Sequence, residues 1–271
     1  MSFLNFKRKQ LSHKTILYLF TIAILSSCKS KNTKTETDWF YLFNGKNLDG
    51  WVAKLNHHNV GDNYANTFRV VNDVLQVNYD GYSEFGERFG HIYYEKPFSS
   101  YHLKFEYRFT DQWMNEASKY TYRNSGVMIH SQDPKTILKD QNWPISIEYQ
   151  ILAEREKGEP RPTGNMCSPG TEVFFKGEMD PHHCISSSSK TYKWDEWVSG
   201  EVIVYQDSII KHIVEGDTVL EYTKPQIGGK IVKGYDPNIK IDGKLLKEGY
   251  IALQAEGQGI EFREIKIKNL K

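Results

Sequence analysis

The chain has 271 residues and a formal net charge of +1, and aromatic residues make up 14% of it. A charge this close to zero creates no long-range field that would attract nucleic acid, and the sequence has no basic patch interleaved with aromatic residues. We therefore expect no nucleic-acid partner, and nothing in the sequence points to a protein partner. The length fits one large β domain or two ordinary ones, with room for a sizeable core.

The first 28 residues have the features of a signal peptide. A basic segment ends at Lys14, and the apolar stretch over 15–25 is too short to span a bilayer as a mature helix. The sequence LSSC at 25–28 resembles the lipobox of bacterial lipoproteins, in which the cysteine is acylated and becomes the first mature residue. The alternative is a plain secretory signal or an anchor helix with an incidental cysteine.

Lipidation of Cys28 would anchor the protein to a membrane, because each buried methylene of an acyl chain contributes about 0.8 kcal/mol. Residues 29–37 are polar and have no apolar period, so we expect a flexible tether. Lys29 and the absence of an acidic run after Cys28 favour an outer-membrane lipoprotein that faces the periplasm over one exposed at the cell surface.

Beyond the tether, the sequence predicts short strands and no helix, because runs of alternating apolar and polar residues recur between turn residues. Asn72-Asp73 and Gln206-Asp207 are expected to be two-residue hairpin loops. Many short strands without intervening helices predict that 38–271 form a single all-β domain, a sandwich of two antiparallel sheets. The expected strands are 67–71, 74–79, 102–110, 125–131, 145–152, 197–205, 208–214, 218–222, 250–255 and 260–267.

Three long loops are expected over 111–123, 132–144 and 153–170, and such loops often carry function in a β-sandwich. Cys167 and Cys184 lie in and after the last of them. In an exported protein they are expected to form a disulfide, with a Cα separation of about 4.4–6.8 Å. The alternative is a metal site that also uses His182 and His183, but its spacing matches no zinc pattern well.

Polar side chains share one face of several expected strands. In 145–152, Glu148 and Gln150 lie opposite Ile147 and Tyr149. If this strand neighbours 102–110 and 125–131, one polar face would collect five candidates: Glu106, Arg108, His130, Glu148 and Gln150. The alternative is a solvated outer face, which is ordinary in antiparallel sheets.

A cleft on that face, rimmed by Trp113 and Trp143 from the long loops, would suit a saccharide. Aromatic rings stack on the apolar faces of pyranose rings, while carboxylates and histidine supply acid/base catalysis. Other polar residues are expected to have a structural role and no catalytic one. Among them are Glu256, Glu261 and Arg263, which are expected to form a structural ion pair at a sheet edge.

Five stretches in order resemble the 3-keto-disaccharide hydrolase domain family, over about residues 39–270. They are FYLFNGKNLDGW at 40–51, RNSGV at 123–127, IEYQIL at 147–152, IKHIV at 210–214, and IALQAEG at 251–257 running on into IEFREI at 260–265. The chain departs from the family at Glu264, where the family has asparagine. It also has a longer segment over 163–184 that carries the cysteine pair, which leaves substrate preference open.

The resemblance implies a concanavalin A-like jelly-roll sandwich, and many family members are lipoproteins of glycan-degrading bacteria. It places Glu148 on the strand that carries carboxylates in jelly-roll glycosidases. Our catalytic candidates are Glu148, His130 and Arg108. Our candidates for substrate binding are Asn124, Ser125, Gln150, Glu106, Trp143, Trp113 and His183.

The activity attached to the family is cleavage of 3-keto-glycosides. A ketone at C3 acidifies the C2 proton, so that one good base and an enolate-stabilising group can expel the C1 substituent, after which water adds. The E-x-D-x-x-E strand of laminarinase-type glycosidases is absent, since Gln150 and Ala153 stand where its second and third carboxylates would be. No cofactor is called for, and a divalent cation is neither required nor ruled out. The alternative is a non-catalytic carbohydrate-binding lipoprotein on the same fold.

Overall fold

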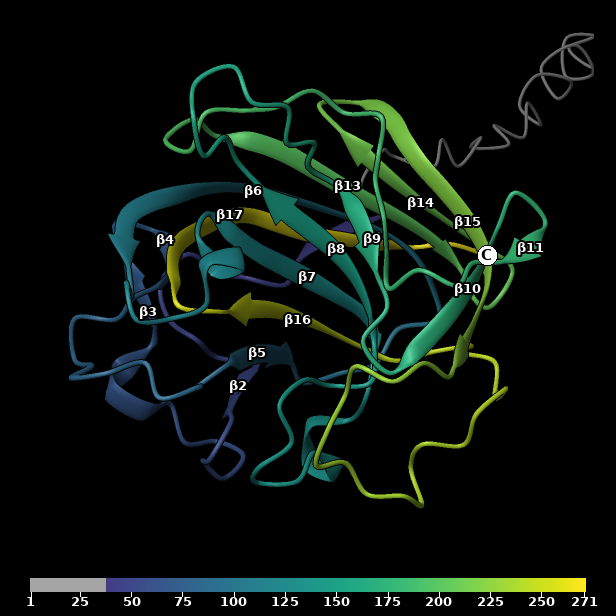
Figure 1. Cartoon of the computed structure of the whole chain (residues 1–271), viewed down its shortest axis with the longest axis horizontal. Coiled ribbons are helices and arrows are strands. Elements are labelled where there is room, and N and C mark those ends of the chain that lie inside the picture. The colour runs from purple at the N-terminus through teal and green to yellow at the C-terminus, as the bar shows by residue number, and fades with distance from the viewer. Residues whose placement is uncertain (1–37) are drawn as a thin grey trace, which may run out of the picture. The chain divides into compact units, whose positions relative to one another are not determined.

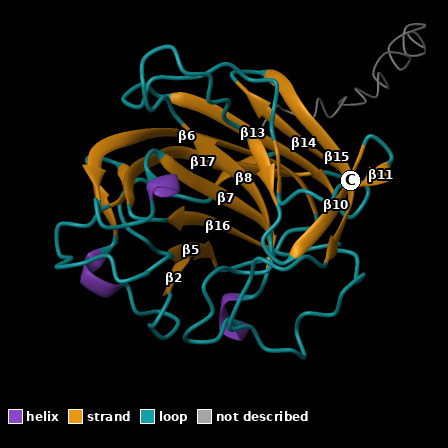
Figure 2. Cartoon of the chain, viewed as in Figure 1, coloured by secondary structure: helices purple, strands orange, loops and turns teal. Residues whose placement is uncertain are grey.

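A computed structural model describes residues 38–271, so the expected signal peptide, Cys28 and the tether lie outside the described residues. Apart from three short 3-10 helices, the regular structure of this part of the chain is β-strand (Figure 2). None of the helices described in 38–271 is long and apolar enough to cross a membrane. The helices are η1 (Tyr64–Asn66), η2 (Lys119–Thr121) and η3 (Pro134–Thr136). The strands are β1 (Trp39–Tyr41), β2 (Trp51–Leu55), β3 (Phe68–Val71), β4 (Val74–Val77), β5 (Gly90–Tyr94), β6 (Ser100–Trp113), β7 (Asn124–Ser131), β8 (Ile147–Leu152), β9 (Asn165–Cys167), β10 (Thr171–Phe175), β11 (Glu178–Met179), β12 (Cys184–Ile185), β13 (Val198–Tyr205), β14 (Ile209–Val214), β15 (Asp217–Ile227), β16 (Tyr250–Ala255) and β17 (Gln258–Asn269).

The strands form two antiparallel sheets that pack as a jelly-roll sandwich, which confirms the predicted fold class (Figure 1). The larger sheet has ten strands in the order β11-β10-β15-β14-β13-β6-β17-β4-β3, with β1 also paired to β17. The smaller sheet has seven strands in the order β12-β9-β8-β7-β16-β5-β2. Strands β6 and β7 therefore belong to different sheets, although they follow one another in the chain.

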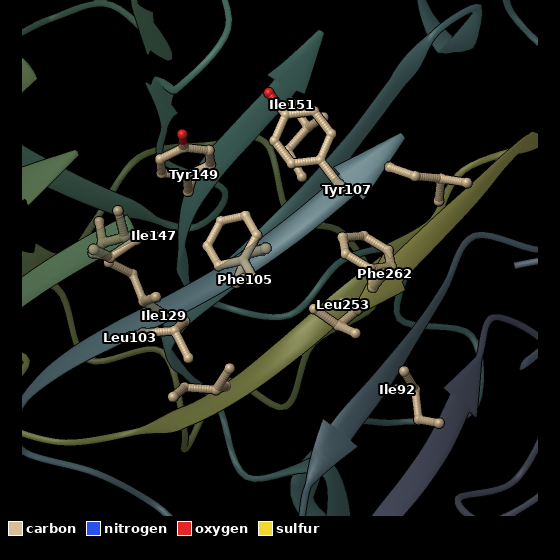
Figure 3. Close-up of a cluster of buried hydrophobic side chains, with 14 of the residues drawn as sticks. Ile92, Leu103, Phe105, Tyr107, Ile129, Ile147, Tyr149, Ile151, Leu253 and Phe262 are labelled. Carbon is tan, nitrogen blue, oxygen red and sulfur yellow. The ribbon is translucent and has the colours of Figure 1, made fainter. Parts of the chain in front are cut away.

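The core lies between the two sheets and is built by the alternation that the sequence shows (Figure 3). In β6, Leu103, Phe105 and Tyr107 are buried, and in β8, Ile147 and Tyr149 are buried against them. The hydroxyl of buried Tyr149 donates a hydrogen bond to the carbonyl of Ile213, at 3.0 Å, across to the larger sheet. With these inner positions filled, the intervening residues of β8 face outward.

Both predicted hairpin turns lie where the sequence placed them, but only the turn at Asn72-Asp73 has the predicted length. Asn72 and Asp73 both have positive φ, at 50° and 64°, as a two-residue hairpin turn requires. The β13–β14 connection has turn residues over 206–208, one more than predicted. The expected long loop over 153–170 contains strand β9. The sequence did not predict this strand, because three residues are too few to show an alternating pattern.

Candidate active site

A cleft of about 420 Å³ lies on the outer face of the seven-stranded sheet. Its floor is formed by side chains of β7, β8 and β9 and by Glu256, directly after β16. Its walls are formed by β12 and by the loops that follow β6, β7, β8, β9, β11 and β15. The lining residues are Tyr120, Asn124, Trp143, Glu148, Gln150, Leu152, Arg155, Arg161, Cys167, Pro169, His183, Cys184, Ile231 and Glu256. The cleft therefore contains the predicted Glu148, Gln150, Asn124, Trp143 and His183.

Glu148 lies across the neighbouring strand β7, over Gly126. A Cβ atom at Gly126 would lie 2.5 Å from Oε1 and 2.7 Å from Cγ of Glu148, closer than real contacts allow. Only glycine leaves room for the carboxyl group in this position. The NSG and IEYQ segments of the sequence thus meet in space, and the glycine determines where the acid lies.

The carboxyl group of Glu148 is strongly desolvated. The residue is 7% exposed, and burial raises the pKa of Glu148 to about 8. No ion pair with a described residue offsets that burial, so the charged form is disfavoured. A carboxyl group with a pKa near working pH, in a cleft, has the properties of a general base or acid.

Glu256, directly after β16, contributes a second carboxyl group to the same cleft. Its pKa lies well above its usual value, because of burial first and the charge on Glu148 second, while the Arg161 guanidinium lowers it in part. The expectation that Glu256 belongs to a structural ion pair is wrong. Such pairs do form on the other sheet, between Arg108 and Glu261 and between Arg263 and Glu106, each at 2.6 Å.

Several buried polar atoms around Gly126 have no hydrogen-bond partner. They are Oδ1 of Asn124, Oε1 of Gln254 and Oε2 of Glu256. The pairing of Leu253 with Val127 places Gln254 beside Gly126, and Asn124 and Glu256 line the cleft together with Glu148. Buried polar groups are normally satisfied, and a cluster of unsatisfied ones in a cleft indicates a site for a polar ligand.

Gln150 is oriented by a neighbouring strand. Its Oε1 accepts a hydrogen bond from Nδ2 of Asn165 at 3.1 Å, and Oδ1 of Asn165 accepts one from the backbone N–H of Ser187 at 2.9 Å. The Nε2 donors of Gln150 are thereby left for the cleft.

The walls combine an aromatic side with a disulfide. Trp143 packs on Phe89, with ring centroids 4.5 Å apart, and lines the cleft. The predicted bond between Cys167 and Cys184 is confirmed, with a Cα separation of 4.1 Å, slightly shorter than expected. These cysteines and His183 place metal-type donor atoms within 4.8 Å of one another, but disulfide-bonded sulfurs are not available as thiolate ligands.

Glu106 and Arg108 do not lie near Glu148, and the prediction that they share its face is wrong. Their alternation was read correctly, since both side chains face away from the core in β6. However, β6 pairs with β13 and β17 in the ten-stranded sheet. There the Arg108 guanidinium lies 4.7 Å from the centre of the Trp197 ring.

His130 is also misplaced by the prediction. Tyr250 pairs with Ser131 and Ala252 with Met128, so β7 has an extra residue here, and His130 has a positive φ of 46°. This β-bulge reverses the alternation. The Nε2 atom of His130 lies 2.9 Å from the carbonyl of Gln206 in the β13–β14 connection, and the residue lines a different cavity.

Two further substrate-binding candidates lie outside the cleft. Ser125 is buried on the inner side of β7, and its Oγ donates to the carbonyl of Gln254 at 3.0 Å. Trp113 ends β6, where its Nε1 donates to Oγ1 of Thr121 at 3.0 Å. Neither residue lines the cleft.

Arg155, Arg161 and Glu256 line the cleft but were not predicted to do so. Both arginines come from the expected loop 153–170, where no periodicity predicts the direction of a side chain. For Glu256 a signal existed, because IALQAEG belongs to the family resemblance and alternation puts Gln254 and Glu256 on the outward face.

A jelly-roll sandwich with acidic groups in an aromatic-walled cleft is an arrangement found in proteins that bind or process carbohydrate. The sequence model of the 3-keto-alpha-glucoside-1,2-lyase-like domain matches residues 38–268, and the chain belongs to this family.

Solved structures agree on the fold. Two structures of proteins from Parabacteroides distasonis, provisionally named glycosyl hydrolases, are each 20% identical to this chain and cover 86% of it. The first has a TM-score of 0.51 with 94% of its own chain covered, and the second 0.50 with 99% covered. No curated protein matches the chain.

Proposed function

We propose that the protein cleaves the glycosidic bond of 3-keto-glycosides by elimination followed by addition of water. The observation that carries the proposal is the pair of desolvated carboxyl groups, Glu148 and Glu256, that converge on one cleft. Membership of the 3-keto-alpha-glucoside-1,2-lyase-like family supports the substrate class.

The two acids have different environments and therefore different roles. Glu148, with a pKa of about 8, is ionised in part near neutral pH and can accept a proton. Burial and the charge on Glu148 hold the pKa of Glu256 well above its usual value, so an ionised Glu148 favours a protonated Glu256 that can donate a proton. Two acids that share a site do not ionise together easily, and this coupling is a recurring basis of acid/base assignment in enzymes.

In the first step Glu148 removes the C2 proton, which the C3 ketone acidifies. The electron pair left at C2 forms the C1–C2 double bond as the C1–O bond breaks, and Glu256 protonates the departing oxygen. In the second step water adds at C1, a proton returns to C2, and the free 3-keto sugar is formed. Donors of Gln150 and Asn124 face the cleft and could bind the ketone oxygen as charge develops on it.

The test is incubation with 3-keto-trehalose or a 3-keto-glucoside in D₂O. Released sugar with deuterium at C2 supports the elimination route, and release without deuterium would indicate direct hydrolysis. Binding without release would support the alternative of a non-catalytic carbohydrate-binding lipoprotein. Neither binding nor release would refute the proposal.

We also propose that the protein works at a membrane surface, held by a lipid on Cys28, in the periplasm. The support is the lipobox-like sequence and the polar segment that would separate the lipid from the domain.

A further inference from the structure

Two arginines extend the cleft beyond the carboxyl pair, and neither takes part in the proposed proton transfers. Arg155 and Arg161 both line the cleft, on the loop that follows β8. Neither forms an ion pair with a carboxylate of the described residues. Two guanidinium groups in one cleft wall that form no salt bridge with a described residue are an unusual use of positive charge in a protein of near-zero net charge.

Arg161 is buried, at 9% exposure, and is anchored through one nitrogen. Its Nη1 donates to the carbonyls of Tyr122, Arg123 and Ala153, at 3.0, 3.0 and 2.8 Å. The Nε and Nη2 donors make no hydrogen bond to the described residues. The guanidinium is therefore fixed in orientation while part of its hydrogen-bonding capacity remains open.

Arg155 is held in a similar way but is exposed. Its Nη2 approaches the carbonyls of Lys119 and Tyr120 at 3.3 and 3.4 Å. The positive charge of Arg155 acts on Arg161, whose pKa is lowered to about 10 by burial first and by Arg155 second. Arginine side chains carry a positive charge in proteins, and both of these line the same cleft, where they can act on one ligand group.

The strand register gives an order along the cleft. Glu148 pairs with Met128, whereas Asn124 pairs with Leu152, at the end of β8 from which the arginine loop departs. Counting on from the pair Leu253–Val127 places Glu256 beside Asn124, and the Arg161 guanidinium is held beyond it, on the carbonyls of Tyr122, Arg123 and Ala153. Glu256 thus lies between Glu148 and the arginines. Because Glu256 is the proposed donor to the departing oxygen, the arginines lie on the leaving-group side.

We propose that Arg155 and Arg161 form a subsite for an acidic group, a carboxylate, sulfate or phosphate, on the leaving group of the substrate. The position of this subsite on the leaving-group side rests on the proposed function. Arginine binds such groups through paired charge-assisted hydrogen bonds, and anchoring by backbone carbonyls lowers the entropy cost of forming them. The favoured substrate class is then a 3-keto-glycoside of an acidic sugar or other acidic alcohol.

The experiment compares three probes: phenyl 3-keto-glucoside and its counterparts with a carboxylate or a sulfonate on the phenyl ring. Their affinities are measured by calorimetry on the Glu148→Gln protein, so that binding is separated from turnover. We expect the acidic probes to bind at least about tenfold more tightly than the neutral one at low salt. The two acidic probes distinguish a carboxylate site from one for sulfate-like groups.

Arg155→Gln, introduced into the Glu148→Gln protein, should reduce the preference to less than about twofold. Arg155 is the better position to change, because Arg161 holds three carbonyls and its loss could unfold the loop. Lys157→Gln is the matched control, since Lys157 is an exposed cation of the same loop that does not line the cleft. That variant should keep the full preference.

Equal binding of the three probes, or a preference unchanged by Arg155→Gln, would overturn the inference while leaving the proposed function intact. If the neutral probe does not bind but the acidic ones do, and Arg155→Gln abolishes that binding, the proposed function fails and the acidic subsite stands. Absence of binding by all three probes would refute both.

Discussion

The side chain of Glu148, on β8, lies directly over Gly126, on β7. Its carboxyl group fills the space that a side chain at residue 126 would take. An added Cβ would lie 2.9 Å from Cδ of Glu148. The clash is with the end of a flexible side chain, so an alanine would displace the carboxyl group without breaking the strand.

We therefore expect Gly126→Ala to lower kcat/KM about 10²-fold, since a displacement of about 1 Å at a reacting group has effects of that size. The measurement is a double-mutant cycle with Glu148→Gln. If the alanine acts through Glu148, it should add little to the loss that Glu148→Gln already causes. An equal further loss in the double variant would show that Gly126 acts on something else.

Replacing Glu148 with glutamine should slow turnover of a 3-keto-glycoside by about 10²–10⁴-fold with the fold retained. The pH dependence gives a second readout. Below its pKa of about 8, Glu148 is mostly protonated and cannot accept a proton, so kcat/KM of the unaltered protein should rise with pH toward 8. The residual activity of Glu148→Gln should lack that rise. Unchanged turnover by the variant would exclude Glu148 as the base.

The same carboxyl group should make folding stability depend on pH. The pKa of Glu148 is about 8 in the folded protein and about 4.3 in an unfolded chain. Because the folded value is the higher one, the contribution of Glu148 to stability is fully present below about pH 4 and is lost as pH rises through 8.

Glu148→Gln should consequently match the unaltered protein in free energy of unfolding near pH 4 and exceed it near pH 8, by on the order of a few kcal/mol. Urea unfolding at both pH values measures this. The exposed Glu178, on β11, supplies the control, since Glu178→Gln should produce no such divergence. A glutamine variant that is less stable at pH 8 would contradict the desolvated state of Glu148.

The disulfide between Cys167 and Cys184 should contribute stability as well as shape the cleft. The two cysteines are paired directly across β9 and β12, and the bond closes a loop with a sequence separation of 17. Reduction, or Cys184→Ser, should lower the free energy of unfolding by about 2–4 kcal/mol. Reductant should have no further effect on a Cys167→Ser/Cys184→Ser protein. Equal stability of the oxidised and reduced forms would contradict this contribution.

Cys28 is expected to carry lipid and to be the first mature residue. Cys28→Ser should move the protein out of the membrane fraction, and intact-mass analysis of the unaltered protein should show an acyl-modified N-terminus. Cys184→Ser is the control and should remain in the membrane fraction. Retention of Cys28→Ser in that fraction would argue for an uncleaved anchor.

How much of this protein could be predicted from its sequence depends on the range of the interactions involved. Alternation is a local property of a strand, so it correctly placed Glu148 and Gln150 outward and Ile147 and Tyr149 in the core. The same rule correctly oriented Arg108 in β6. The turn at Asn72-Asp73 was likewise readable, because its conformation depends on the two residues themselves.

Tertiary structure alone decided which outward faces share a sheet. Pairing of β6 with β13 and β17, and of β7 with β8 and β16, is a non-local choice made by packing of the whole core, and it separates Arg108 from Glu148. A single extra residue at His130 reverses a face, and no local pattern shows where a bulge will form. The same packing brings Glu256, more than a hundred residues away in the chain, into the cleft of Glu148, and two acids desolvated together have raised pKa values that neither would have on an isolated strand.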